Sequence, residues 1–425
     1  YIVLSANEPF NGSASEIFGS EIAQRQKLLK QTSIPANSEP NTRKFIQQLA
    51  LAADQFIVKR RNGTSIIAGY PWFDDWGRDA MIALPGLCLS TKRFAEAREI
   101  LETFAANIRN GLIPNRFLNS EEIEYNTVDA SLWFIIATHE YYKATGDLKF
   151  VRYHCLNPIM EIIEAYSAGT DFKIQEQPDG LISAGSHSTQ LTWMDARIER
   201  LAVTPRNGKP VEVNALWYNA LKIAAGFNLR LARVMRSRYF NKRAKYTLKS
   251  FNNFWFEEGG YLYDLLPKDP SASIQAVHSE LRPNQIFALS LPFPLVDTIK
   301  GQRILQTIEN QLLTPVGLRT LNREHAHYCE QYRGDVIDRD LAYHQGTVWL
   351  WLIGPYLRAL KRYGGNSRII KTKVTAILEG IQPQLLQAGF GSLSEIFDAE
   401  TPHTPRGCIA QAWSVGEVLR ELTSK

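Results

Sequence analysis

Apolar side chains recur at helical spacing along most of this chain. Near its start, for example, Phe45, Leu49 and Phe56 fall on one face of a helix. Connectors rich in glycine, proline and asparagine separate the periodic stretches. The pattern predicts twelve helices, at about residues 42–59, 78–90, 93–109, 127–145, 149–168, 211–230, 236–257, 282–292, 298–313, 345–363, 367–387 and 408–423.

The apolar surface of these helices predicts how they are arranged. Some, such as the stretches at 100–108 and 348–360, are apolar over more than one narrow stripe, as are helices covered on two sides. Helices that alternate between inner and outer positions predict an all-α fold, six hairpins closed into an (α/α)6 barrel. An open helical solenoid is the alternative. Helical periodicity fails at 172–194, 259–266 and 314–340, where we expect short β insertions in loops.

The first part of the chain differs from the rest. Residues 1–40 contain prolines, glycines and serines and lack a sustained helical pattern. We expect them to be a lead-in or the remnant of an upstream domain. Residues 41–425 are then expected to form the barrel domain.

Composition narrows the class of protein. The chain has 425 residues, 44% of them hydrophobic and 21% charged, with a formal net charge of +5, which is ordinary for a globular protein. Basic residues cluster between Arg230 and Lys249 on a predicted helix, and without a binding motif a solvated helix face is favoured over a nucleic-acid patch. No apolar run reaches the roughly 18 residues that span a bilayer. Four cysteines without CxxC spacing are typical of a reducing compartment, so we expect a cytoplasmic protein.

The densest group of functional side chains lies at residues 70–79. It contains Trp72 and Trp76 with Arg78, and the carboxylates Asp75 and Asp79 stand beside them. A sugar ring fits such a surface, because its C–H face stacks on indole while its hydroxyls pair with arginine donors and carboxylate acceptors. The alternative is a buried Arg–Asp pair flanked by core tryptophans.

Two later segments place an acid beside aromatic or small residues. Asp195 follows Trp193 in a loop, and partial desolvation there would raise its pKa toward the range useful for a general acid. Its alternative role is a helix cap or an ion pair. Glu395 follows a glycine-rich approach at 389–394, where backbone can come close to a ligand, and its alternative is a solvated loop residue.

Two further segments carry polar side chains near predicted helix starts. Glu212 lies where a negative charge is favourable in any case, so alone it indicates little. His344 and Gln345 precede a glycine, and a histidine in such a place is more often a structural hydrogen-bonding residue than a catalyst.

The two acids on separate loops meet the requirement for glycoside hydrolysis. One carboxyl group protonates the leaving oxygen, and the other activates water or attacks the anomeric carbon. No metal site is predicted, because the histidines show no ligand spacing beyond His325 and His327, which lack an obvious third ligand. The chain has no P-loop, GxGxxG or GxSxG motif, and we expect no cofactor.

Seven motifs together make the chain resemble the C-terminal amylo-α-1,6-glucosidase domain of glycogen debranching enzymes. They occur in the family's order over about residues 42–422, which is nearly the whole chain, so the combination is far more specific than any one motif. The motifs lie at 69–79, 125–133, 192–196, 204–217, 282–284, 343–346 and 411–414.

The resemblance implies a fold, a reaction and residue roles. The family's fold is an (α/α)6 barrel, and its members release glucose from α-1,6 branch stubs of glycogen or limit dextrin with inversion. By resemblance, Asp195 is the general acid and Glu395 the general base, with Glu400 as the alternative base. Arg78 and Asp79 match an Arg–Asp pair that grips the terminal glucose in related barrels.

Other readings of the same barrel stay open at this point. A glucoamylase-like or trehalase-like α-glucosidase would keep the fold and change the substrate. A catalytically inactive carbohydrate-binding domain would keep the aromatic residues without a working acid pair. The expected substrate-binding residues are Trp72, Asp75, Trp76, Arg78, Asp79, Trp193, Glu212, His344 and Gln345.

Overall fold

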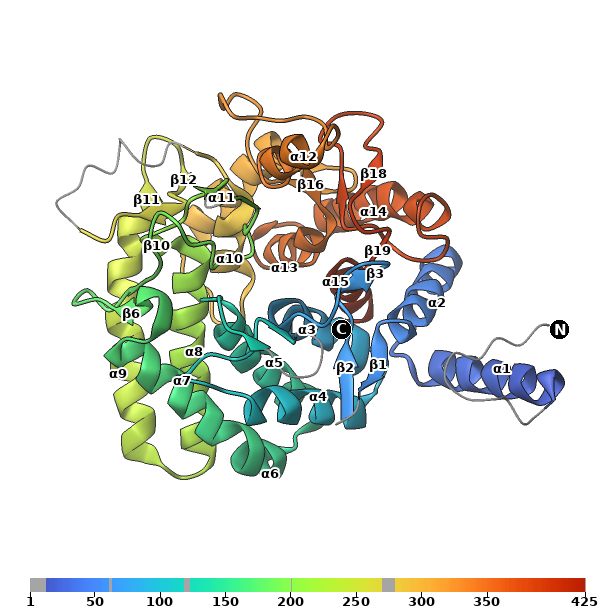
Figure 1. The fold of residues 1–425 in the computed structure, drawn as a ribbon, viewed down its shortest axis with the longest axis horizontal. Coiled ribbons are helices and arrows are strands. Elements are labelled where there is room, and N and C mark those ends of the chain that lie inside the picture. Colours follow the sequence, from blue (N-terminus) through green and yellow to red (C-terminus); the bar gives the residue numbers. More distant parts are fainter. Residues whose placement is uncertain (1–12, 61–62, 118–122, 200, 270–279, 425) are drawn as a thin grey trace.

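Helices make up most of the computed structural model, which describes residues 13–60, 63–117, 123–199, 201–269 and 280–424 (Figure 1). The α-helices in this part of the chain are α1 (Ala14–Gln31), α2 (Pro40–Asp54), α3 (Gly77–Leu84), α4 (Phe94–Ala106), α5 (Ala130–Thr145), α6 (Leu148–Phe150), α7 (Leu156–Ala168), α8 (Val211–Arg230), α9 (Val234–Phe251), α10 (Phe287–Ser290), α11 (Thr298–Gln311), α12 (Val336–Ala342), α13 (Ile353–Tyr363), α14 (Ser367–Ile381) and α15 (Ala412–Thr423).

Six of these helices pack in sequence, each on the next. They are α3, α5, α8, α10, α13 and α15, and α15 packs back on α3. Six others lie against them, with α2 on α15, α4 on α5, α7 and α9 on α8, and α11 and α14 on α13. Every residue of α3 is buried, and α5 and α15 are buried over most of their lengths, which explains why these segments are apolar on several sides.

The strands are short and occupy the connections between helices. They are β1 (Ile57–Arg60), β2 (Gly63–Ile66), β3 (Gly69–Tyr70), β4 (Arg116–Phe117), β5 (Ile123–Glu124), β6 (Gln175–Glu176), β7 (Ile182–Ser183), β8 (Arg197–Ile198), β9 (Leu201–Ala202), β10 (Lys209–Pro210), β11 (Trp255–Phe256), β12 (Tyr261–Leu262), β13 (Leu265–Leu266), β14 (Leu313–Thr314), β15 (Gly317–Arg319), β16 (Val348–Trp349), β17 (Ile396–Phe397), β18 (Pro405–Arg406) and β19 (Ala410–Gln411).

The largest sheet in the described residues joins distant parts of the sequence. Its strands follow the order β14-β15-β16-β17-β18, and all neighbours are antiparallel. Val348 of β16 pairs with Phe397 of β17, and this pairing brings the loops around Tyr343 and Glu395 together. A second pairing, β19 with β3, sets Ala410 opposite Tyr70. The insertions predicted at 172–194, 259–266 and 314–340 do contain strands.

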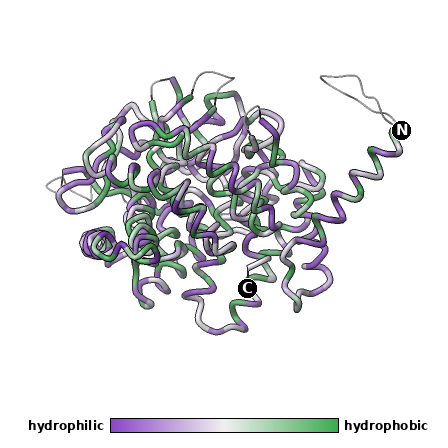
Figure 2. Tube along the Cα trace, turned by 90° about the horizontal axis from the view of Figure 1, so that it is seen from below, coloured by the Kyte–Doolittle hydropathy of each residue, from purple (hydrophilic) through white to green (hydrophobic). Residues whose placement is uncertain are grey.

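The predicted absence of a helix before residue 40 was wrong. Residues 1–12 lie outside the described residues, but α1 follows them and projects from the body (Figure 2). A capping box between Ser13 and Glu16 starts this helix, and Leu28 is its one buried residue. Because so little of α1 is buried, its sequence carries no strong apolar stripe.

Several predicted helix boundaries and one burial pattern also need correction. The helix predicted at 42–59 corresponds to α2, which ends at Asp54 because the β-branched residues beyond it enter the β1–β2 hairpin. The segments at 345–363 and 408–423 begin with strands β16 and β19, and an unpredicted helix, α12, begins inside 314–340 and ends at Ala342. The stretch at 100–108 is not covered on two sides, since α4 buries one face. None of the described helices is long and apolar enough to cross a membrane.

Candidate active site

One cavity collects side chains from most of the predicted motifs. The volume of this cavity is about 100 Å³. Its lining residues come from the starts of α3 and α15, the turn after α12, strand β16 and three loops. They are Phe73, Trp76, Arg78, Asp79, Trp193, Asp195, Tyr343, Trp349, Glu395, Gln411 and Trp413.

Arg78 is the buried cation of this site. Its Nε donates to Asp129 Oδ1 at 2.8 Å, and one terminal nitrogen donates to Asp195 Oδ2 at 3.1 Å. The other terminal nitrogen donates to Thr127 and to the carbonyl of Leu191, both at 3.3 Å. Burial alone would lower the pKa of Arg78, but the surrounding carboxylates raise it. The guanidinium therefore stays charged and ties the loop of Asp195 to α3 and α5.

Asp79 follows Arg78 in the first turn of α3 and faces the cavity. Only 6% of the residue is exposed. Burial, together with the nearby charges of Asp195 and Glu395, raises the pKa of its carboxyl to about 8 against the opposing charge of Arg78. Near neutral pH this carboxyl is mostly protonated, so it can donate a hydrogen bond as well as accept one.

Glu395 is held in the cavity from both sides of its carboxylate. The Tyr343 hydroxyl donates to Oε1, and the backbone N–H of Cys408 donates to Oε2 at 2.9 Å. Burial raises the pKa of Glu395 to about 7, although both hydrogen bonds oppose this rise. Gly407 has φ +62°, and a Cβ there would lie 2.3 Å from Oε2, so a larger residue would be strained and would displace this carboxylate.

Asp195 is the most accessible of the three cavity carboxyls, with 30% of its side chain exposed. The nearest nitrogen of His344 lies 3.9 Å from its Oδ1, beyond hydrogen-bond distance. We predicted that the pKa of Asp195 would be raised, and this prediction was wrong. Burial does act to raise it, but the interactions with His344 and Arg78 outweigh burial and lower the pKa below its ordinary value.

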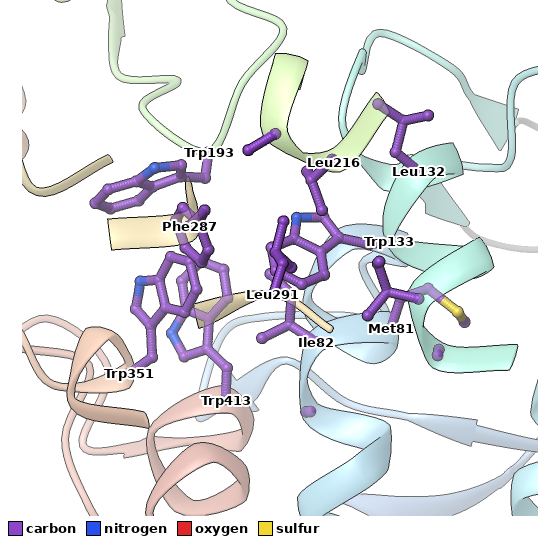
Figure 3. Close-up of a cluster of buried hydrophobic side chains, with 14 of the residues drawn as sticks. Met81, Ile82, Leu132, Trp133, Trp193, Leu216, Phe287, Leu291, Trp351 and Trp413 are labelled. Atoms are coloured by element: carbon purple, nitrogen blue, oxygen red, sulfur yellow. The ribbon is translucent and has the colours of Figure 1, made fainter. Parts of the chain in front are cut away.

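A cluster of buried aromatic side chains includes Trp193 and Trp413, which line the cavity (Figure 3). Trp193 lies edge-on to Trp349 and Trp351, with ring centroids 5.2 and 5.3 Å apart, and Trp351 stacks on Trp413 at 5.0 Å. The indole N–H of Trp193 donates to Asn284 at 2.7 Å. This packing fixes the residue two positions before Asp195.

Five of the predicted substrate-binding residues do not line the cavity. Trp72 is 59% exposed, while Asp75 is buried and accepts a hydrogen bond from Ser65. Glu212 is also buried, in an ion pair with Arg206. The remaining two lie behind the lining.

Those two residues are His344, which stacks on Trp349, and Gln345, whose Oε1 accepts from Arg282 at 2.8 Å. The alternative base Glu400 also lies outside the lining, where it pairs with Arg323 and accepts a hydrogen bond from Tyr328.

Five lining residues were missed by sequence reasoning. Phe73, Tyr343, Gln411 and Trp413 lie inside motifs that were recognised, and Trp349 lies three residues after one. The sequence signal that could have identified these residues was therefore membership of a recognised motif. Which of its members face the cavity depends on the tertiary structure.

Comparison with known proteins places the chain among carbohydrate-active enzymes. A family model described as amylo-alpha-1,6-glucosidase matches residues 51–420. The glycogen debranching enzyme of Saccharomyces cerevisiae is 25% identical over 420 residues. That match covers 75% of this chain and 27% of the yeast protein, so the chain spans about a quarter of its relative.

Proposed function

Because the chain belongs to the amylo-alpha-1,6-glucosidase family, we propose that it is an inverting, exo-acting glycoside hydrolase. Its substrate would be a branched, glycogen-like α-glucan, from which it releases glucose at α-1,6 branch points. One observation carries this proposal: Asp195 and Glu395 face the same cavity, which tryptophan rings line on several sides. Glycoside hydrolysis requires two carboxyl groups that flank one site.

The proposed roles come from the resemblance to the family. Glu395, with a pKa of about 7 and two hydrogen bonds that orient it, is the base that activates water. Asp195, the more exposed acid, donates a proton to the leaving oxygen.

In the free protein Arg78 favours the ionised form of Asp195. Asp195 must therefore take up a proton when substrate binds. Hydrogen bonds between Arg78 and sugar hydroxyls would weaken the interaction of Arg78 with the Asp195 carboxylate and so favour protonation of Asp195.

Binding of the terminal glucose is proposed for the other lining residues. Asp79 can exchange hydrogen bonds with sugar hydroxyls, and Trp76, Trp193 and Trp413 offer faces or edges to the ring. His344, Gln345 and Glu212 lie behind this surface, so we propose that they act by positioning the residues that line it.

We also propose that the helices close into an (α/α)6 barrel. The packing of α3, α5, α8, α10, α13 and α15 into a cycle supports an inner ring. The partners α2, α4, α7, α9, α11 and α14 alternate with them along the sequence, as an outer ring requires. Residues 41–425 would then be the barrel domain, and residues 1–40 a lead-in to it. The four free cysteines support a cytoplasmic location.

The experiment that tests the function compares substrates. The chain is incubated with limit dextrin trimmed to single-glucose stubs, with untrimmed limit dextrin, with maltose and with trehalose, and free glucose is assayed. Release from the trimmed dextrin well above release from either disaccharide supports the proposal. Preference for maltose or trehalose would replace it with a glucoamylase-like or trehalase-like activity. Absence of release from every substrate would contradict an enzymatic role.

A further inference from the structure

Three apolar side chains stand exposed on neighbouring segments beside the cavity. They are Trp72, Ile409 and Phe390, with 59%, 42% and 82% of each residue exposed. We call them the apolar ridge. Exposure of large apolar residues to water is energetically unfavourable, and a group of them on one surface often marks a binding site.

Backbone hydrogen bonds show that the three segments are adjacent. Strand β19 pairs with β3, with Ala410 opposite Tyr70, so Ile409 lies beside the segment that leads to Trp72. On the other side of β19, the Gln411 N–H donates to the carbonyl of Leu393 at 2.9 Å. Ile409 therefore lies between the Trp72 segment and the loop that carries Phe390.

The ridge is continuous with the wall of the cavity. Trp72 lies edge-on to Phe73 with ring centroids 6.5 Å apart, and Phe73 lies edge-on to Trp76 at the same separation. Phe73 and Trp76 both line the cavity. The other two segments of the ridge contribute Gln411 and Glu395 to the same lining.

The conformation of Phe390 is costly and points to a role outside the fold. Its φ is +35°, a region that bulky residues rarely adopt, and its side chain is almost fully exposed. Gly389 and Gly391 flank it, and a Cβ on Gly389 would lie 2.4 Å from the carbonyl oxygen of Ile409. Backbone strain that is not offset by burial of the side chain is often found at ligand-binding loops.

From these contacts we infer that the apolar ridge binds the glucan main chain that carries the branch, on the leaving-group side of the scissile bond. This rests on the proposed function. The cavity binds the terminal sugar, and the rest of the uncharged polymer must extend out of the cavity past its rim. Aromatic and aliphatic side chains there match the C–H faces of glucose rings. The ridge thereby favours a stub on a long chain over a small glucoside.

The test uses two substrates that differ in the leaving group. Alpha-glucosyl fluoride occupies the cavity without a main chain, whereas dextrin with single-glucose stubs presents both. In the double variant Trp72→Ala/Phe390→Ala we expect kcat/KM for the dextrin to fall at least about tenfold, mainly through KM, because each lost aromatic contact weakens binding. Activity on the fluoride should stay within about twofold. The matched control is Met235→Ala/Tyr239→Ala, which removes exposed side chains from α9.

Each outcome decides the inference. An equal loss on both substrates means that the ridge shapes the cavity, and an unchanged KM for the dextrin means that the main chain does not touch it; either result overturns the inference. Retardation in a gel containing unbranched α-glucan separates this from the proposed function, because it needs no catalysis. Retardation that the ridge variant loses and the α9 control keeps supports the ridge even if the parent releases no glucose. Equal retardation of all three proteins overturns the inference.

Discussion

Three carboxyl groups share one cavity with a single buried guanidinium, and the structure gives them different protonation. Burial raises the pKa of Asp79 and Glu395, whereas Arg78 and His344 outweigh burial at Asp195 and lower its pKa. The proposed division of roles comes from the family resemblance, and the neighbours of each acid set its protonation in the free protein. The different protonation of the three carboxyl groups leads to a different prediction for each residue.

Asp195 and Glu395 should respond differently to the leaving group. A positioned general acid contributes about 10²–10⁴-fold in rate, so Asp195→Asn should lose a factor in that range in kcat on the natural stub. A good leaving group needs little protonation, so an activated substrate such as α-glucosyl fluoride should partly restore Asp195→Asn and leave Glu395→Gln inactive. Steady-state kinetics on both substrates measure this. Near-normal turnover of Asp195→Asn on the stub would place the acid elsewhere.

Asp79 should tolerate replacement by an amide better than truncation. With a pKa of about 8, its carboxyl is mostly neutral at pH 7, and asparagine reproduces a neutral group with a donor and an acceptor. Asp79→Asn should raise KM for the stub by less than about tenfold at pH 7, and Asp79→Ala should raise it more. If the two variants are equally impaired, the ionised carboxylate is the form that binds.

The sequence allowed the acids to be predicted, but not their electrostatics. Asp195 stands in a recognisable motif, and Glu395 follows a glycine-rich segment. The pKa of Asp195 depends on Arg78, 117 positions earlier in the chain, and that of Glu395 on Tyr343, which was not singled out. Desolvation could be inferred from a neighbouring tryptophan, whereas the identity of a distant charge partner could not.

At the scale of elements, the functional side chains lie where helices and strands begin or end. Arg78 and Asp79 open α3, and Trp413 opens α15. The helices were predictable because their apolar positions repeat over many residues. Two-residue strands such as β17 and β19 show no period, yet they set the register that brings Glu395 to the cavity.

Gly407 offers a test of that register. Gly407→Ala adds a Cβ 2.3 Å from Glu395 Oε2, so the carboxylate must move, and we expect kcat to fall at least about tenfold. Gly365→Ala is the matched control, because its φ of +76° imposes similar backbone strain with no atom within 4 Å. Both variants should lose roughly 1 kcal/mol of unfolding free energy. Equal kcat values for the two variants would show that the position of Glu395 does not depend on this glycine.

At the scale of the whole molecule, the packing cycle of helices surrounds a continuous apolar core, and α1 stands outside it (Figure 1). The mostly helical fold was predictable from the number of apolar segments with helical spacing. The projecting α1 was not, because an exposed helix needs no apolar stripe.

The buried acids should make stability depend on pH. Asp79 and Glu395 bind protons more tightly in the folded chain than in the unfolded chain, with pKa values of about 8 and about 7 against ordinary values of 3.8 and 4.5. Their contribution to stability is therefore complete below about pH 4 and is lost as pH rises toward 8. Relative to the parent, Asp79→Asn and Glu395→Gln should gain unfolding free energy between pH 5 and pH 8, on the order of 1 kcal/mol or more. Denaturant unfolding at both pH values measures the gain, and a constant difference would contradict these pKa shifts.

The anomeric form of the first glucose released tests the central claim most directly. Proton NMR follows the chain acting on dextrin with single-glucose α-1,6 stubs, before mutarotation mixes the anomers. With Glu395 activating water and Asp195 protonating the leaving oxygen, the account predicts β-glucose first. Initial α-glucose would require a covalent intermediate and would contradict the assigned roles. Absence of glucose from this substrate would contradict the proposed activity itself.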